Sequence, residues 1–153
     1  MANADIIIVG PSETELVAAL FNEVFAPHRD QAFFERRFKS RYNVLNLIAE
    51  VDGRPVGFCS GFELKPNTWF NWLFGVLPDF RRAGIAAQLI EAEHAWAADR
   101  GYEFVRMECH NQHRPVLHLA ISMGFDVVGI RYDNDRHSNL VIFEKELVSD
   151  EAR

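Results

Sequence analysis

The sequence predicts a mixed α/β protein with a central sheet of about seven strands and about four helices on its faces. Residues 45–51 alternate apolar and polar side chains with the two-residue period of a strand. Residues 85–96 instead carry apolar side chains at the spacing of an amphipathic helix. Segments of the two kinds are interleaved in the order β-α-α-β-β-β-α-β-α-β-β, which is typical of a mixed sheet covered by helices.

Length and composition indicate one globular domain. The chain has 153 residues, close to the usual size of a domain, so we expect a single domain over residues 1–153. Hydrophobic residues make up 48%, with 13 Phe and 3 Trp, which supplies a core and excludes a disordered chain. The net charge of −6 argues against a dedicated nucleic-acid binder, because such domains are usually basic.

Cysteine content and the N-terminus favour a cytoplasmic protein. Cys59 and Cys109 cannot build a disulfide framework or a cysteine-based zinc site, and a reducing compartment is the simplest setting for them. The N-terminus lacks a basic region, and the apolar run at residues 6–9 is too short for a signal peptide or a membrane span. The histidines between residues 110 and 118 do not share a helical face, so no metal is expected.

The individual elements follow from periodicity and turn residues. We expect strands over residues 6–9, 45–51, 56–62, 68–77, 104–109, 125–130 and 139–147, and helices over 16–24, 30–42, 85–100 and 116–123. Ser12 and Glu15 have the spacing of a capping box at the start of the first helix. Asp52 and Gly53 indicate the turn of a hairpin.

One junction between a strand and a helix carries the chemistry. It reads Arg81-Arg82-Ala83-Gly84, and the helix begins at Ile85. Helix N-termini expose unpaired amides with partial positive charge, small residues let phosphates reach them, and arginines add charge. The junction therefore predicts a pyrophosphate cradle, although it is neither a Walker loop nor a dinucleotide fingerprint. The alternative is two ordinary surface arginines beside a turn glycine.

The junction resembles the coenzyme A motif of the GNAT acetyltransferase superfamily. Residues 81–86, RRAGIA, are similar to that family's Arg/Gln-x-x-Gly-x-Gly/Ala motif, and Val76 and Pro78 stand where its preceding strand ends. Residues 111–125 are similar to a second signature, an Asn before a helix that closes on Gly-Phe. The element order also matches, so the resemblance covers essentially the whole chain.

The resemblance implies an N-acetyltransferase that uses acetyl-CoA as co-substrate. In this family acetyl-CoA binds where two central parallel strands splay, here the strands ending at Val76 and Cys109. The backbone of Gly75 and Val76 would pair with the pantetheine arm and polarise the thioester carbonyl. Asn111 would help to fix the arm or the strand end, with helix capping as the alternative. The pyrophosphate would be held by Arg81, Arg82, Ala83, Gly84, Ile85, Ala86 and Ala87.

The resemblance also implies direct attack of an amine on the acetyl carbon in a ternary complex, which requires a base. The family often has a Glu on the strand before the motif, where this chain has Asn71, a residue able to orient a water. Glu108 and His110 share one face of the next strand by alternation. Either could take the proton, directly or through water; the alternative is that both merely face solvent.

The expected acid is absent from its usual position. Ala120 stands where the family frequently has a Tyr, so Ser122, Tyr132 or a bound water would have to protonate the leaving thiolate.

We expect the acceptor to be the primary amine of a small molecule. A non-catalytic acyl-CoA-binding or sensory module, and an enzyme for a protein lysine or N-terminus, are the alternatives. The aromatic residues of the second helix and of the strand over 68–77 either line the acceptor pocket or belong to the core. Edge strands near the C-terminus make a homodimer a candidate assembly.

Overall fold

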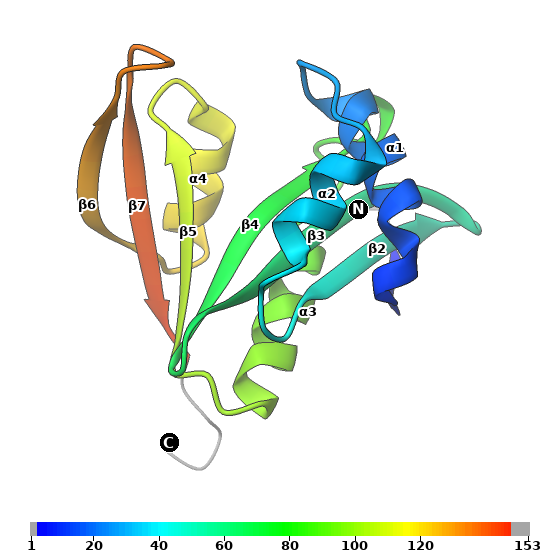
Figure 1. The fold of residues 1–153 in the computed structure, drawn as a ribbon, viewed down its shortest axis with the longest axis horizontal. Helices are drawn as coiled ribbons and strands as arrows, with labels where there is room; N and C mark the ends of the chain where they lie inside the picture. The colour runs from blue at the N-terminus through cyan, green and yellow to red at the C-terminus, as the bar shows by residue number, and fades with distance from the viewer. Residues whose placement is uncertain (1–2, 148–153) are drawn as a thin grey trace.

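The fold is built on one sheet with the strand order β1-β2-β3-β4-β5-β7-β6 (Figure 1). This computed structural model describes residues 3–147. Neighbouring strands are antiparallel except β4 and β5, which are parallel. The predicted mixed sheet of seven strands is confirmed. The strands are β1 (Asp5–Val9), β2 (Leu45–Val51), β3 (Arg54–Lys65), β4 (Thr68–Val76), β5 (Phe104–His110), β6 (Asp126–Asp133) and β7 (Ser138–Glu146).

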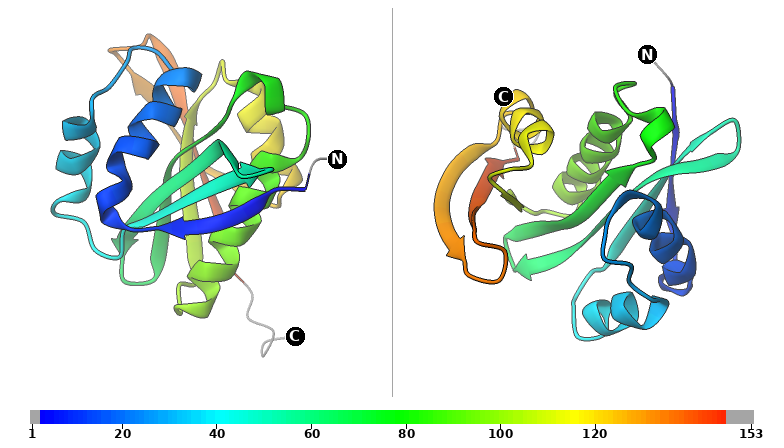
Figure 2. Two further views of the ribbon diagram at one scale, coloured as in Figure 1. Left: turned by 90° about the vertical axis from the view of Figure 1, so that its right-hand side faces the viewer. Right: turned by 90° about the horizontal axis from the view of Figure 1, so that it is seen from above.

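Helices cover the sheet on both faces. They are α1 (Thr14–Val24), α2 (Gln31–Phe38), α3 (Ile85–Asp99) and α4 (Arg114–Ser122), with 3-10 turns at Pro11–Glu13 and Pro78–Phe80. α1 and α2 lie on one face, and α3 and α4 lie on the other (Figure 2). On the α1–α2 face, the described helices leave the part of the sheet formed by β5, β6 and β7 uncovered (Figure 2).

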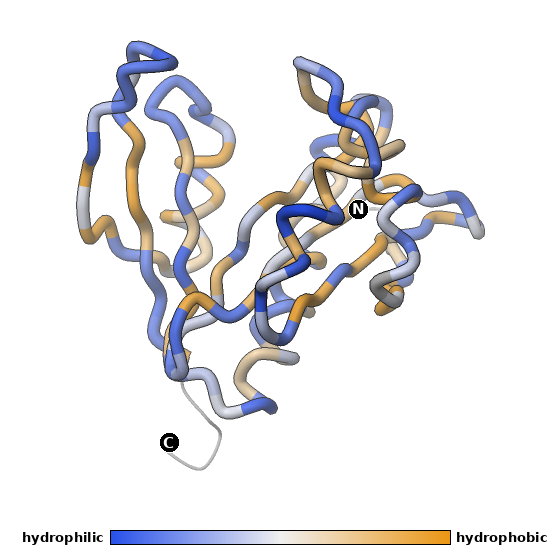
Figure 3. Tube along the Cα trace, viewed as in Figure 1, coloured by the Kyte–Doolittle hydropathy of each residue, from blue (hydrophilic) through white to orange (hydrophobic). Residues whose placement is uncertain are grey.

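Two apolar layers hold the helices to the sheet. Leu89 and Ile90 of α3 and Val105 of β5 are fully buried in the layer beneath α3 and α4. Val17 of α1 and Phe34 of α2 are fully buried in the other layer. Each such side chain contributes about 2 kcal/mol when it leaves water. Polar residues instead gather in loops such as the one between β6 and β7 (Figure 3).

The predicted capping box at the first helix is wrong. The N-cap of α1 is Glu13, and no side chain caps the helix. Ser12 lies in the 3-10 turn Pro11–Glu13 that precedes α1. A proline at the first position favours such a turn, because its missing N–H would have no partner there anyway.

Two helix boundaries also differ from the prediction. α2 ends at Phe38 and does not continue to residue 42. The chain reverses at Asn43, which has a left-handed φ of 55°, and then enters β2. α4 begins at Arg114, two residues earlier than predicted, because Pro115 fits the first helical turn without the loss of a hydrogen bond.

Candidate active site

β4 and β5 separate midway along their length (Figure 1). Their parallel pairing joins residues 68–71 to residues 104–107 and stops there. β4 nevertheless continues to Val76 and β5 to His110. We call the point where the pairing ends the apex of the splay; it lies after Asn71 on β4 and after Met107 on β5. Beyond the apex the two strands diverge and the sheet opens.

β4 has a bulge at the same point. Its pairing with β3 shifts register between Ser60, which pairs with Leu73, and Gly61, which pairs with Asn71, so Trp72 is the extra residue. A bulge interrupts the ladder locally and bends the strand. The bulge therefore accounts for the departure of β4 from β5 at the apex.

Beyond the apex, β4 presents the backbone of Phe74 and Val76 to the open side. The N–H of Leu77 donates to the carbonyl of Val56 on β3 at 2.8 Å. Because the ladder alternates, the backbone of Gly75 also points to β3, whereas Phe74 and Val76 point away from it. The backbone of Gly75, which we predicted to pair with the pantetheine arm, is thus turned toward β3. The backbone groups at the open edge of β4 are those of Phe74 and Val76.

The loop before α3 exposes a run of amides. Arg82 and Gly84 have left-handed φ angles of 62° and 79°, and Gly84 is the N-cap of α3 with no side-chain cap. The first intrahelical bond runs from the N–H of Gln88 to the carbonyl of Gly84 at 3.1 Å. Within residues 3–147, the amides of residues 82–87 form no hydrogen bond. Such a concave run of amides at a helix N-terminus attracts an anion.

Arg81 fixes a positive charge at the edge of this loop. Its Nε donates to the carbonyl of Val76 at 3.1 Å, which ties the loop to the open edge of β4. Residues 82–87 and the open edge of β4 therefore lie side by side. Together they offer donors to one extended ligand with an anionic end.

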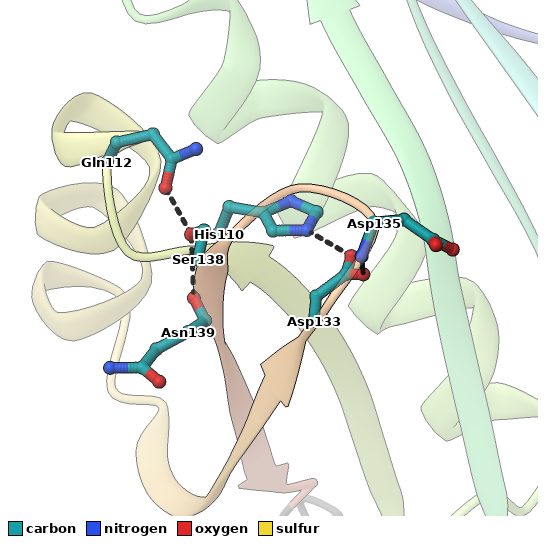
Figure 4. A network of polar contacts seen from close by, with 6 residues as sticks. All are labelled: His110, Gln112, Asp133, Asp135, Ser138 and Asn139. Atoms are coloured by element: carbon teal, nitrogen blue, oxygen red, sulfur yellow. Dashed lines mark hydrogen bonds and ion pairs between the residues drawn. The ribbon is translucent and has the colours of Figure 1, made fainter.

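On β5, polar side chains beyond the apex lie on the face that no described helix covers. Glu108 is exposed, whereas its neighbours Met107 and Cys109 are buried in the layer beneath α3 and α4. Nε2 of His110 lies 2.9 Å from Oδ2 of Asp133 on β6 (Figure 4). The predicted sharing of one face by Glu108 and His110 agrees with this burial pattern.

The contact between His110 and Asp133 fixes which ring nitrogen carries a proton. The hydrogen bond from His110 lowers the pKa of Asp133, so at neutral pH its carboxylate can only accept. Nε2 of His110 is then the donor, which leaves Nδ1 as the nitrogen that can take a proton. The ring of His113 lies 6.0 Å away, and burial followed by the charges of His110 and Arg136 lowers its pKa.

Asn71 lies on the opposite side of the sheet from Glu108 and His110. It is buried, and its Nδ2 donates to Oε1 of Glu93 on α3 at 3.0 Å. The Sγ of Cys59 donates to Oε2 of the same carboxyl at 3.1 Å. Burial raises the pKa of Glu93 to about 7, and hydrogen bonding to the carboxyl, that of Cys59 first, opposes the shift only in part. The structure therefore does not bring Asn71 together with the other two predicted catalytic residues.

Sequence reasoning missed two of these groups. Glu93 had a visible signal, because it follows Ile85 and Leu89 at four-residue spacing on the apolar stripe of α3. Asp133 had none, because only the pairing of β5 with β7 and of β7 with β6 brings it to His110.

α2 and the turn that follows it place arginines over the aromatic residues near the apex. The guanidinium of Arg37 lies 5.2 Å from the ring centroid of Trp72 and 5.8 Å from that of Phe62. The guanidinium of Arg41 lies 4.6 Å from the Phe62 ring. Burial, followed by the charge of Arg41, lowers the pKa of Arg37, and the charge of Glu108 opposes that shift. Arg37 is therefore close enough to Glu108 to feel its charge across the apex.

The aromatic residues divide between core and surface. Phe34, Phe38 and Trp69 are buried and belong to the core. Phe33, Trp72 and Phe74 are only half-buried. A hollow of about 570 Å³ at the α1–α2 loop is lined by Asn22, His28, Arg29, Asp30, Phe33 and Arg36.

The remaining candidates lie around α4. Asn111 is exposed, and the N-cap of α4 is His113, so Asn111 does not cap that helix. Ala120 is buried. The hydroxyl of Ser122 donates to a carbonyl of its own helix at 2.8 Å, and Tyr132 is exposed on β6. Among residues 3–147, no group of three or more His, Cys, Asp or Glu side chains could hold a metal ion.

A parallel strand pair that splays beside the uncapped N-terminus of a helix is an arrangement that suits an extended anionic ligand. The sequence pattern of the acetyltransferase (GNAT) family matches residues 13–125. The chain belongs to the GNAT acetyltransferase family, and the resemblance drawn from the sequence is confirmed.

Solved structures share this fold at low sequence identity. The ribosomal-protein-S18-alanine N-acetyltransferase from Escherichia coli superposes with a TM-score of 0.83 and 17% identity, covering 96% of each chain. The yncA protein from Salmonella typhimurium, solved with its cofactor acetyl-CoA, gives a TM-score of 0.77 and 15% identity over 95% of each chain. Nourseothricin acetyltransferase gives a TM-score of 0.64 and 21% identity, covering 69% of this chain and 66% of its own.

No curated protein sequence matches this chain. None of the helices within residues 3–147 is long and apolar enough to cross a membrane.

Proposed function

We propose that the protein transfers the acetyl group of acetyl-CoA to the primary amine of a small molecule. One observation carries the proposal: the amides of residues 82–87, which form no hydrogen bond within residues 3–147, lie beside the open edge of β4. This arrangement suits a ligand with a pyrophosphate at one end and an amide-containing arm, and acetyl-CoA is such a ligand. The cofactor bound to the yncA protein, which shares the fold, supports the choice.

The residues of the chain divide the binding between them. The amides of residues 82–87 would hold the pyrophosphate, and Arg81 and Arg82 would add positive charge. The backbone of Phe74 and Val76 would pair with the arm along the open edge of β4. Acetyl-CoA supplies an activated acyl thioester, whose reactive end would lie at the apex. Asn111, which lies just beyond the end of β5, would contact the arm from the other strand.

Glu108 is the residue that we assign as the proton acceptor. An alkylammonium with a pKa of about 10 must lose a proton before it can attack. Glu108 is the first residue of β5 beyond the apex, and its side chain is exposed on the open face. His110 lies about 7 Å farther along the strand, and its Nε2 already donates to Asp133. His110 therefore serves as the alternative acceptor, through Nδ1.

Water is the proton donor to the leaving thiolate in this proposal. Ala120 has no hydroxyl, and the hydroxyl of Ser122 is engaged within its helix. A thiol has a pKa of about 8.5, so the thiolate is a weak base and does not need a strong acid nearby.

Proteins with this fold are named for different acceptors. One solved structure is named for an alanine of a ribosomal protein and another for nourseothricin. A panel of small amines and of peptides, incubated with acetyl-CoA, separates these classes. We expect release of free thiol, with acetylated product detected by mass spectrometry, for small amines. Acetylation of peptides alone would move the function to a protein acceptor. Binding of acetyl-CoA without turnover of either class would leave a non-catalytic binding module.

Assembly as a homodimer stays a prediction. β6 is an edge strand, and Val127, Ile130 and Tyr132 on it are more than half exposed, at 54%, 64% and 55%. Light scattering over a range of protein concentrations measures the assembly directly.

A further inference from the structure

The α2 region carries positive charge that is not paired with a carboxylate within the described residues. Its residues 36, 37, 39 and 41 are all basic, in a chain whose net charge is −6. Within residues 3–147, basic nitrogens lie within 4.0 Å of carboxylate oxygens only in the pairs Arg106–Glu144 and His110–Asp133. Arg37 and Arg41 therefore have no carboxylate partner in the described part of the chain.

These two guanidinium groups are held in place by aromatic rings. Arg37 lies over both Trp72 and Phe62, and Arg41 lies over Phe62. Stacking of this kind orients the planar guanidinium and restricts its rotamers, yet it uses none of its N–H donors. Arg37 is thus a pre-oriented cation with donors available for a planar or tetrahedral anion.

Arg37 also lies next to the proposed reaction centre. Trp72, beneath it, is the first residue of β4 beyond the apex, as Glu108 is the first residue of β5. Glu108 is among the charges that act on Arg37. A small acceptor with its amine at Glu108 would consequently place its neighbouring groups against Trp72 and Arg37.

The hollow at the α1–α2 loop extends this basic surface. Two of its six lining residues are the arginines Arg29 and Arg36. Its acidic member, Asp30, is engaged as the N-cap of α2, with Oδ1 accepting from the N–H of Phe33 at 2.9 Å. Phe33 in turn contacts Trp72, with ring centroids 6.0 Å apart. The hollow therefore continues the same basic and aromatic surface away from the apex.

We propose that the acceptor carries an anionic group, a carboxylate or a phosphate, near its amine, and that Arg37 binds this group with support from Arg41. Glu108 and Arg37 would then select a zwitterionic acceptor by opposite charges. A guanidinium suits this task because it can donate two parallel hydrogen bonds to one carboxylate or phosphate. The inference rests on the proposed acetyl transfer and names the class of its acceptor.

Matched acceptors test the inference. Amino acids with two to five atoms between amine and carboxylate are compared with their carboxamides, and phosphoethanolamine is compared with ethanolamine. For the wild type we expect kcat/KM to be at least about tenfold higher for the anionic member of the best pair. The carboxylate and phosphate pairs distinguish the two sources of negative charge.

Variants of α2 locate the effect. Arg37→Gln should raise KM for the anionic acceptor at least about tenfold and change that for the neutral partner less than about twofold. Lys39→Gln, which removes the same charge from an exposed position just after α2, should leave both KM values unchanged. Arg37→Glu should reverse the preference toward diamines. Calorimetry of the same acceptors in the presence of coenzyme A gives an independent Kd for each variant.

The outcomes separate this inference from the proposed function. If the wild type acetylates neutral amines as well as anionic ones, or if Arg37→Gln lowers kcat equally for both, the assignment of Arg37 is overturned and acetyl transfer stands. An equal loss would mean that Arg37 only balances the charge of Glu108. If no amine of any charge is acetylated, acetyl transfer to small amines fails, and this inference fails with it.

Discussion

The two halves of the candidate site are built in different ways. Apart from Asn111, the side proposed for the cofactor is one continuous segment, from the bulge at Trp72 to the first turn of α3, and it offers mainly backbone groups. The acceptor side is assembled from distant segments, with Arg37 on α2, Glu108 on β5 and Asp133 on β6, and it offers side chains. A site made of local backbone leaves a motif in the sequence, whereas a site assembled by the sheet does not.

The difference also decides which substitutions matter. Backbone amides are insensitive to side-chain chemistry but sensitive to bulk and to φ, so cofactor binding should be lost when a small residue is enlarged. On the acceptor side, function should be lost when the charge of a side chain is removed with little change of its shape. The following substitutions use these two kinds of change, from the largest expected effect to the smallest.

Glu108→Gln should lower kcat by about 10²–10⁴-fold, because the amide cannot accept the proton of the attacking ammonium. The Kd for acetyl-CoA should not change. Glu103→Gln, at an exposed position just before β5, is the matched control and should keep wild-type kcat. A loss of less than about threefold in Glu108→Gln would remove this residue from the role of base.

Glu93→Gln should change how stability depends on pH. The pKa of Glu93 is raised by burial from 4.5 to about 7, so between these values the native state holds a proton that the unfolded state has lost. The contribution of this proton to the free energy of unfolding is complete below pH 4.5 and is lost as the pH rises toward 7. For the wild type the loss is about 3 kcal/mol. Urea unfolding at several pH values should show this slope reduced in the variant. An identical slope in both proteins would mean that Glu93 titrates normally.

Gly75→Ala tests whether Gly75 packs against the core or contacts the cofactor. A Cβ at Gly75 would lie 3.0 Å from Val24 of α1 and 3.1 Å from Phe25 and Phe58, so we expect a loss of about 1–3 kcal/mol in unfolding free energy. Gly129→Ala, whose Cβ would meet Ile142 at 3.6 Å, is the matched control and should be nearly neutral. If Gly75→Ala kept wild-type stability but lost acetyl-CoA binding, Gly75 would contact the cofactor after all.

Asp133→Asn should have the smallest effect if Glu108 is the base. The substitution removes the carboxylate that orients the His110 ring, and we expect a change in kcat of less than about tenfold with KM unchanged. The pH profile of kcat provides the comparison. A loss as large as that of Glu108→Gln would transfer the role of base to His110.

The sequence was most informative where structure is set locally. Strand alternation placed Glu108 and His110 on one face, and the residues around Gly84 indicated the cradle, because both depend on neighbours in the chain. It was least informative at Asn71. Asn71 pairs with Met107 in the parallel register of β4 and β5, which puts it on the α3 side of the sheet, opposite Glu108. That register joins two distant segments and leaves no trace in residues 68–77.

Helix ends show the same limit. The spacing of Ser12 and Glu15 satisfied the rule for a capping box, but the turn at Pro11–Glu13 supplied a different entry into α1. The aromatic spacing of α2 continued to residue 42, whereas the chain leaves the helix after Phe38 to reach β2. In each case the path of the chain to the next element overrode a local preference.

Calorimetric titration with acetyl-CoA tests the central claim, that the amides at the N-terminus of α3 hold the cofactor. Wild type is compared with Gly84→Glu and with Gly101→Glu, which adds the same charge at the other end of α3. Both glycines have left-handed φ angles, 79° and 87°, so the two variants carry similar backbone strain. With all three proteins folded by circular dichroism, we expect wild type and Gly101→Glu to bind and Gly84→Glu not to bind. Wild-type affinity in Gly84→Glu, or no binding by the wild type, would contradict the account.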